Sequence, residues 1–347
     1  MFQGVSLHSS HITHMAWIER HWQSVTPVSA LLYPASLLYR AVASIRRAAT
    51  APQRLPVPVI VIGNVTVGGT GKTPLTLWLE KTLRDSGWMP GIVCRGYGGS
   101  SRGPQPVLAE SDPAACGDEA VLLARRSGCA VWAGADRVAT AHALLASRPE
   151  CNVVLSDDGL QHYALARDVE ICVVDAARGF GNGWLLPAGP LREPLSRVAT
   201  VDAVVVNGSP DALHPSLARL PGAAPRFPMK LQGNGFRNLA DPARVAGTGS
   251  FRGKRVHAVA GIGNPQRFFS HLRQLGLDFT EHPFPDHHPF VASDLAFAQA
   301  EAVVMTEKDA VKCRSFATEL HWELAVSAAP DPDLAGLVLR KLQTRKR

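Results

Sequence analysis

The chain has no cysteine pair spaced for metal binding and no long uninterrupted apolar run. Its six cysteines are scattered and none forms a C-x-x-C pair, so neither a zinc site nor a disulfide framework is indicated. No segment reaches the roughly 18 uninterrupted apolar residues that argue for a membrane-spanning helix. Repeats and low-complexity tracts are also missing. We therefore expect a globular cytosolic protein with reduced, buried thiols.

The body of the chain also lacks a basic stripe with interleaved aromatic residues, the pattern of a nucleic-acid surface. The net charge is nevertheless +7, so we expect an anionic partner other than nucleic acid, such as a membrane surface or a phosphorylated substrate. With 347 residues, of which 46% are hydrophobic and 19% charged, the chain has enough apolar material for a core. The length suggests about two domains.

The most informative stretch is a glycine-rich loop that runs from Gly63 to Thr73 and ends in Gly-Lys-Thr. It follows an apolar run at 57–62 and precedes an amphipathic stretch at 74–83, which predicts a strand, a loop and a helix. In this layout backbone N–H groups and the helix N-terminus surround phosphate groups. Lys72 is predicted to reach the β- and γ-phosphates, and the Thr73 hydroxyl to bind Mg²⁺. The predicted nucleotide-binding residues are Thr66, Val67, Gly68, Gly69, Thr70, Gly71, Lys72 and Thr73.

One position departs from the pattern G-x-x-x-x-G-K-[ST], because Thr66 stands where glycine is expected. The alternative interpretation is a glycine-rich turn that binds nothing. The correctly placed Gly-Lys-Thr favours binding of a nucleoside triphosphate. Many GTPases read guanine through Asn-Lys-x-Asp, whereas here Lys308 directly precedes Asp309. The difference favours ATP.

Short apolar runs alternate with helical stretches along most of the chain. These runs are 57–62, 91–94, 130–133, 153–156, 171–174, 203–206, 256–260 and 302–305. Such alternation predicts an α/β fold with a doubly wound, mostly parallel sheet. The segment 210–254 is rich in Pro, Gly and Ala and weakly periodic, so we expect a linker and a domain boundary there. A strand at 256–260 and a helix at 266–275 are predicted to begin a second, smaller α/β unit.

The N-terminal part changes character at Met15, which is an alternative start of the chain because residues 1–14 are polar and unlike a signal peptide. Aromatic and leucine side chains then precede Arg40, Arg46 and Arg47. This pattern suits a helix that lies in a membrane interface, and it suits a helix packed on the protein's own core equally well. Pro34 is expected to kink or divide the helix.

Two carboxylates end an apolar run in the middle of the chain. Asp157 and Asp158 follow the run at 153–156, and His162 lies shortly after them. In P-loop proteins a carboxylate at the end of a neighbouring strand holds Mg²⁺ directly or through water. Together with Thr73, these carboxylates are predicted to form a metal site. The alternative is an Asp-Gly turn that closes a strand.

Further polar motifs are candidates for catalysis. Asp118 opens a predicted helix and is either a helix cap or a general base. His287 lies in Pro285-Asp-His-His-Pro289, which suits a histidine beside a carboxylate, a weak zinc site or a solvated loop. After a proline-rich turn, Arg192 can clamp a phosphate and Glu193 can hold a polar group.

Taken together, these motifs resemble those of the tetraacyldisaccharide 4′-kinases, lipid A pathway enzymes of Gram-negative bacteria. The resemblance extends from about residue 15 to 315 and rests on GNVTVGGTGKTP (63–74), CRGYGG (94–99), GDEA (117–120), SDDGLQH (156–162), LLPAGPLREP (185–194), AGIGNPQRFF (260–269), FPDHHPF (284–290) and MTEKDAVK (305–312). It implies ATP-dependent, Mg²⁺-requiring phosphorylation of the 4′-hydroxyl of a tetraacylated glucosamine disaccharide 1-phosphate. The family's loop also tolerates a hydroxyl residue at the position of Thr66.

The resemblance also implies roles for particular residues. Asp118 paired with His287 is expected to receive the hydroxyl proton, and Asp158 to be the principal metal carboxylate. His162 falls among residues of less certain role in the active site. The implied catalytic residues are Lys72, Asp118, Arg192 and His287, and the implied metal-site residues are Thr73, Asp157, Asp158 and Glu193.

The implied architecture is a P-loop NTPase-like core with a smaller C-terminal lobe and an N-terminal membrane-associating helix. The expected divisions are 15–50 for the interfacial helix, 51–225 for the P-loop kinase core and 226–347 for the C-terminal lobe. The implied location is the cytoplasmic face of the inner membrane, where a peripheral enzyme acts on an anionic glycolipid. We expect a monomer. Two alternatives stay open: a P-loop kinase or ligase acting on a soluble small molecule, and a nucleotide-switched binding protein.

Overall fold

The computed structural model describes residues 18–220 and 222–345. The predicted start of the N-terminal helix at residue 15 lies outside these ranges. The described strands are β1 (Val59–Gly63), β2 (Pro90–Cys94), β3 (Gln105–Val107), β4 (Ala130–Ala133), β5 (Val153–Asp157), β6 (Val169–Asp175), β7 (Ala203–Asn207), β8 (Arg226–Asn238), β9 (Val245–Gly247), β10 (Val256–Ala260), β11 (Thr280–Pro283), β12 (Ala302–Thr306) and β13 (His321–Pro330). The described α-helices are α2 (Pro27–Ala49), α3 (Lys72–Asp85), α4 (Pro113–Cys116), α5 (Asp118–Arg126), α6 (Arg137–Ser147), α7 (Pro265–Gln274), α8 (Glu307–Cys313) and α9 (Asp333–Arg345).

One sheet runs through the whole molecule in the order β11-β10-β12-β13-β8-β7-β6-β1-β5-β2-β4-β3, with β9 paired to β8. In its larger half β1 lies between β5 and β6, and both pairings are parallel. Alternate residues of β1 face opposite ways: Ile60 packs in the cluster with α3, α5 and α9, whereas Val61 packs in the cluster with α6. Helices thus cover both faces, and the predicted doubly wound α/β class is confirmed.

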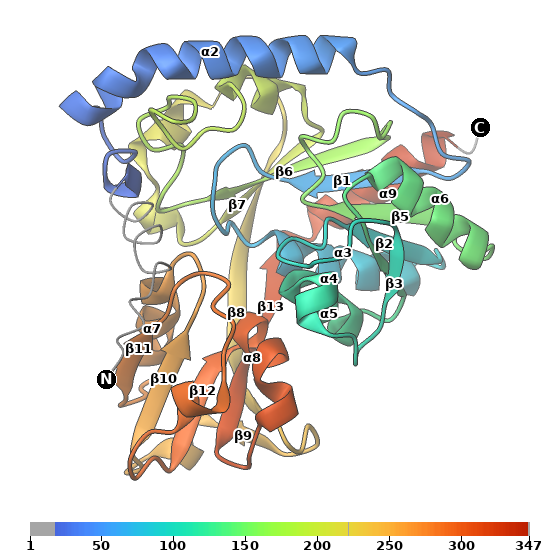
Figure 1. Cartoon of the computed structure of the whole chain (residues 1–347). Helices are drawn as coiled ribbons and strands as arrows, with labels where there is room; N and C mark the ends of the chain where they lie inside the picture. Colours follow the sequence, from blue (N-terminus) through green and yellow to red (C-terminus); the bar gives the residue numbers. More distant parts are fainter. Residues whose placement is uncertain (1–17, 221, 346–347) are drawn as a thin grey trace, which may run out of the picture.

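The smaller half contains β10, β11 and β12 with α7 and α8, and it forms the lower lobe in Figure 1. The long antiparallel pair of β8 and β13 connects the two halves, because β8 begins parallel to β7 and then continues along β13. α9 returns from this lobe and buries Leu334, Val338 and Leu342 in the core cluster that contains α3. The division at residues 225 and 226 stays a prediction.

The prediction of a linker in 210–254 was wrong, because this segment holds the 13-residue strand β8. The sequence hides the strand because a proline at 228 argues against a central strand and the polar stretch from Gln232 to Gly235 interrupts the alternation of apolar residues. β13 compensates by pairing with β8 over most of its length, with a register shift between Ala325 and Ser327.

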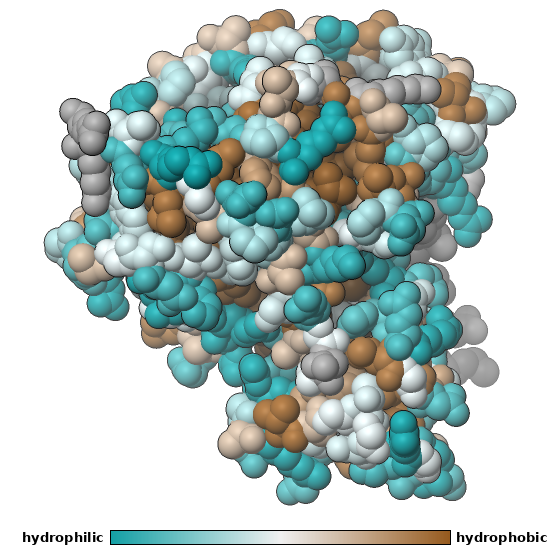
Figure 2. Space-filling model, turned by 180° about the vertical axis from the view of Figure 1, so that it is seen from behind, coloured by the Kyte–Doolittle hydropathy of each residue, from teal (hydrophilic) through white to brown (hydrophobic). Residues whose placement is uncertain are grey.

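We expected Pro34 to kink or divide this helix, but α2 is continuous through Pro34 and is not divided. Proline removes the N–H that would bond to the carbonyl of Ala30, and Ala30 is exposed, so water can reach that carbonyl. α2 lies along the top of the larger half in Figure 1, and Figure 2 shows hydrophobic residues among hydrophilic ones along this edge. Within the described residues α2 is the one helix long and apolar enough to cross a membrane, by length and composition alone.

Candidate active site

The glycine-rich loop connects β1 to α3 and is held from several sides. Gly71 precedes α3 in the left-handed region with φ 95°, and a Cβ atom there would lie 2.5 Å from Nδ2 of Asn207. Asn207, at the end of β7, donates to the carbonyl of Thr70 at 2.8 Å. The Lys72 ammonium lies 3.3 Å from Oδ1 of Asn64. The loop therefore has a fixed shape, and its position before α3 suits an anionic group.

The two consecutive carboxylates meet this loop in different ways. Asp157 is buried at the end of β5 and accepts hydrogen bonds from the hydroxyls of Thr73 at 3.3 Å and Thr76 at 2.8 Å. Burial, reinforced by the carboxylate of Glu119, raises the pKa of Asp157 to about 6. Asp157 is therefore close both to the hydroxyl of the glycine-rich loop and to the first turn of α5.

Asp158 lies between two cations, because its carboxylate is 3.4 Å from Lys72 and 3.3 Å from Arg192. Burial works to raise the pKa of Asp158, but Lys72 and Arg192 outweigh it and hold this pKa below its usual range. The Oδ1 atom, which is buried and makes no hydrogen bond, is the atom that lies 3.4 Å from the Lys72 ammonium. Asp158 is thus held ionised and already faces a cation.

Glu193 is buried and surrounded by polar partners. It accepts a hydrogen bond from Gln161 at 2.7 Å and another from the hydroxyl of Tyr163, and it lies 3.5 Å from Nε of Arg197. These contacts orient the segment next to Arg192. The predicted metal role of Glu193 stays a prediction.

Asp118 and His287 come together from opposite halves of the molecule, although 169 residues separate them. Asp118 begins α5 and is buried, and its Oδ2 lies 2.9 Å from Nδ1 of His287. Its Oδ1 accepts the backbone N–H of Glu119 at 2.8 Å. The aromatic ring of Tyr97 packs on the His287 ring with 5.1 Å between centroids. Asp118 and His287, which were predicted to act together as the general base, are therefore in contact.

The charges around this pair shift both pKa values. Burial works to raise the pKa of Asp118, but the hydrogen bond with His287 and the nearby Lys308 outweigh it and lower this pKa. The hydrogen bond to Asp118 raises the pKa of His287, against the opposing effects of burial and of Lys308. Asp118 is thus held ionised, as a proton acceptor requires.

His162 lies in the turn after β5 and contacts the first residue of α6. Its Nε2 accepts the backbone N–H of Arg137 at 3.2 Å. Burial, together with the Arg137 guanidinium, lowers the pKa of His162 to about 4, so the ring is neutral at physiological pH. His288, the other residue of the His-His motif, lies 2.9 Å from Asp294.

Two cations to which the sequence analysis gave no role in the site also belong to this region. Arg178 follows β6 and donates to the carbonyl of Gly69 in the glycine-rich loop. Lys308 lies within 3.4 Å of Glu119, Asp286 and His287. Their position in the sequence could have indicated both residues. Each lies within three residues of the end of a parallel strand, where ligand-binding residues gather.

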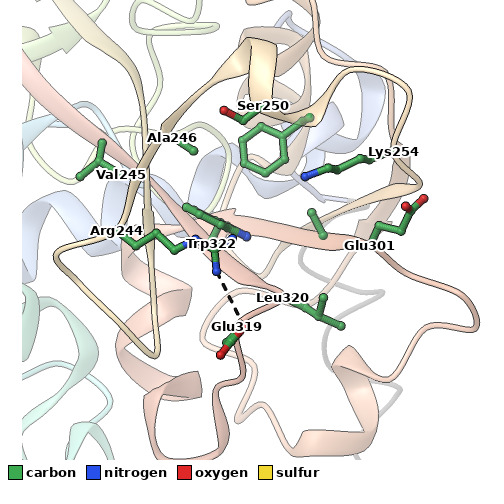
Figure 3. A pocket seen from close by; sticks show the side chains of 11 residues that line it. Arg244, Val245, Ala246, Ser250, Lys254, Glu301, Glu319, Leu320 and Trp322 are labelled. Atoms are coloured by element: carbon green, nitrogen blue, oxygen red, sulfur yellow. Dashed lines mark ion pairs between the residues drawn. The ribbon is translucent and has the colours of Figure 1, made fainter.

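A cavity of about 240 Å³ lies in the smaller half, away from all predicted site residues (Figure 3). Trp322 lies in its wall, with Arg244 at 5.1 Å over the indole ring and Glu319 at 3.9 Å from Arg244. A second cavity, of about 610 Å³, adjoins the C-terminal end of α2 and has four arginines in its lining, namely Arg47, Arg54, Arg167 and Arg197. Neither cavity contains the glycine-rich loop.

Comparisons with known proteins agree on one family. The family model of the tetraacyldisaccharide-1-P 4′-kinases matches residues 28–343. The chain is 53% identical over 328 residues to the tetraacyldisaccharide 4′-kinase of Azoarcus sp. strain BH72, covering 93% of this chain and 94% of that one. It is 51% identical over 334 residues to the enzyme of that name from Dechloromonas aromatica, covering 95% and 98%.

A solved structure gives the same result. LpxK from Aquifex aeolicus, described as an "apo" form in complex with ATP, superposes with a TM-score of 0.75 and 28% identity, covering 91% of this chain and 99% of that one. Sequence and fold agree over almost the whole length. The chain belongs to the tetraacyldisaccharide-1-P 4′-kinase family.

Proposed function

We propose that this chain transfers the γ-phosphate of ATP to the 4′-hydroxyl of a tetraacylated disaccharide 1-phosphate, with Asp118 as the proton acceptor. The observation that carries the proposal is the contact between Asp118 and His287, which joins the two halves at 2.9 Å. The alternatives of a soluble substrate or a nucleotide-switched binding protein are not favoured by relatives that carry one enzymatic name over nearly the full chain.

The glycine-rich loop is proposed to bind the phosphates of ATP. Its backbone N–H groups and the N-terminus of α3 are suited to the anionic oxygens. Lys72 neutralises charge on the transferring phosphoryl group, which is the main protein contribution to such reactions. Arg192, 3.3 Å from Asp158, is proposed to assist it once the nucleotide replaces this ion pair. Arg178 adds a further cation on the outer side of the loop.

The residues present fit a magnesium ion. Thr73 supplies a hydroxyl next to Asp157, and the buried Oδ1 atom of Asp158 makes no hydrogen bond and faces the Lys72 ammonium at 3.4 Å, so the carboxylate is ionised and suited to a cation. Among the described residues no three His, Cys, Asp or Glu side chains gather to hold a metal alone. This agrees with Mg²⁺, which is commonly held by one or two carboxylates together with substrate phosphates. When bound, the ion would neutralise phosphate charge.

Asp118 is proposed to accept the proton of the attacking hydroxyl. Its carboxylate is ionised and its orientation is fixed by the N–H of Glu119 and by His287. Glu119, which follows Asp118, contributes through its charge to the raised pKa of Asp157. A general base accepts the proton of the attacking hydroxyl as the new phosphate bond forms.

α2 is proposed to lie along an anionic membrane surface rather than across the membrane. One side of the helix is attached to the body, since Ser36 donates to the carbonyl of Leu185 at 2.8 Å and Tyr39 donates to that of Arg192 at 3.0 Å. Large hydrophobic side chains are exposed elsewhere on α2, namely Leu31, Leu37, Leu38, Val42 and Ile45. The last turn carries Arg46 and Arg47, which suit anionic head groups.

The experiment that tests the proposal is transfer of label from [γ-³²P]ATP to tetraacyldisaccharide 1-phosphate in detergent micelles. Lys72→Ala is expected to abolish labelling. Lys81→Ala is the matched control, because Lys81 lies on the same helix, is exposed and pairs only with Asp85 among its ion pairs. ATP turnover without labelled lipid in the wild type would point to a different acceptor and would contradict the proposal.

A further inference from the structure

Lys308 of the smaller half contacts His287 of its own half and reaches across to Glu119 of the larger half. It is the second residue of α8, and its side chain is only 17% exposed. Its ammonium lies 3.2 Å from Glu119 on α5, 3.4 Å from Asp286 and 3.3 Å from Nε2 of His287. A cation therefore contacts the imidazole nitrogen that does not face Asp118.

The charged and titratable groups around this ammonium come from three elements. α5 contributes Asp118 and Glu119, and the loop before residue 290 contributes Asp286 and His287. α8 itself contributes Asp309 and Lys312, which lie 2.9 Å apart, and Lys312 approaches Asp118 only to 4.0 Å. The Tyr97 ring packs on His287 from the other side. Lys308 is thus the cation in contact with the imidazole.

The contact favours one position of the imidazole proton. An ammonium can only donate hydrogen bonds, so a hydrogen bond from Lys308 at 3.3 Å requires Nε2 to be the accepting nitrogen of a neutral ring, and the Asp286 carboxylate lies farther from Nε2, at 3.8 Å. The proton is then on Nδ1, which donates to Oδ2 of Asp118 at 2.9 Å. This tautomer leaves Asp118 ionised and orients it. A positive charge next to Nε2 also disfavours a second proton on the ring, because both would be cationic.

We propose that Lys308 is a positioning residue that holds His287 in the neutral tautomer donating to Asp118. The inference rests on the proposed role of Asp118 as the base. Lys308 and His287 both belong to the smaller half, whereas Asp118 and Glu119 belong to α5 of the larger half, so closure of the halves brings the oriented imidazole to the carboxylate. Base strength and closure are thereby linked.

A second ion pair between the same helices provides a matched control. Arg126 of α5 pairs with Glu307 of α8, and Glu307 also accepts the backbone N–H of Val326 at 2.9 Å. This pair joins the same two halves, yet neither of its members contacts Asp118 or His287 in any hydrogen bond or ion pair of the described residues. Loss of Arg126 therefore weakens closure without removing the cation beside the imidazole.

The test is the pH dependence of kcat/KM for the full-length enzyme with ATP and the lipid acceptor. For Lys308→Met we expect the acid limb of the profile of kcat/KM against pH to shift to higher pH by about one unit, since a neighbouring charge shifts a pKa by one unit or more. We also expect a roughly tenfold loss of kcat near neutral pH, with the KM for ATP unchanged. Lys308→Arg should return the acid limb to its wild-type position, and Arg126→Met should leave that position unchanged.

Other outcomes overturn the inference. An unshifted limb in Lys308→Met, or an equal shift in Arg126→Met, would mean that Lys308 acts only through closure. ¹⁵N NMR of the wild-type imidazole needs no variant: a proton on Nδ1 of His287 is expected, and a proton on Nε2 contradicts the inference. Wild-type turnover by Asp118→Asn would instead remove the proposed base, so the two failures are distinguishable.

Discussion

Replacing Asp118 and His287 singly and together tests whether the two residues act as one unit. Asp118 is 5% exposed and 2.9 Å from His287, so each side chain depends on the other for its ionisation and orientation. Asp118→Ala removes the proton acceptor itself and is expected to lower kcat by about 10⁴, the upper end of general-base effects. His287→Ala leaves Asp118 in place beside Lys308, and is expected to cost about 10².

The double variant is then expected to lose about 10⁴, because without Asp118 the imidazole has no carboxylate to orient. Independent action would instead give about 10⁶. The difference of two decades corresponds to a coupling free energy of about 2.7 kcal/mol, at roughly 1.36 kcal/mol per decade.

The assay is single-turnover transfer of ³²P from γ-labelled ATP to the lipid acceptor at saturating concentrations. ATP affinity, measured by calorimetry, is the control and should be unchanged, because neither residue belongs to the glycine-rich loop. Wild-type turnover in either single variant, or a double variant near 10⁶, would refute the reasoning.

Three further predictions concern the glycine-rich loop, the exposed side of α2 and the ionisation of Asp118. Gly71→Ala should lower the free energy of unfolding by at least roughly 1–2 kcal/mol, measured by urea denaturation, because φ is 95° and the new Cβ would overlap Asn207; an unchanged midpoint would count against the described loop. Replacing both Leu38 and Ile45, each 68% exposed, by Glu should weaken sedimentation with anionic vesicles by at least tenfold while leaving the fold intact; undiminished binding would exclude α2 as the membrane contact. Asp118 has a lowered pKa in the folded protein, so its contribution to stability is present above the ordinary value of 3.8 and is lost as pH falls through the lowered value. Asp118→Asn should therefore flatten the acid limb of a stability profile, and an unchanged limb would contradict the assigned shift.

The sequence predicted the parts of the fold that have strong local signals. The run at 57–62 and Gly-Lys-Thr correspond to β1 and the start of α3, because β-branched residues and a glycine-rich turn act over a few neighbours. β8 was missed, since its glycines and polar residues are compatible with a strand only when β13 and β7 supply partners. Such pairing is a long-range property that no local pattern encodes.

The candidate site divides in the same way. Lys72, Thr73 and the pair Asp157 and Asp158 were predicted from spacing, because loop and strand ends are local features. The resemblance suggested that Asp118 and His287 form a pair, whereas the residues alone left a helix cap and a solvated loop open. The contact of Lys308 with His287 was not predicted, since it depends on how α8 packs against the loop after β11. Charged residues in the first turn of a helix are common, so only the fold distinguishes this one.

The most direct test of the central claim compares the natural acceptor with its 4′-deoxy analogue in the γ-labelled ATP assay. The account predicts one new phosphate monoester, located at the 4′ position by ³¹P NMR, and no labelling of an analogue that still binds. It also predicts that product formation with the natural acceptor falls with Asp118→Asn. Labelling of the 4′-deoxy acceptor, or a phosphate at another position, would contradict the account.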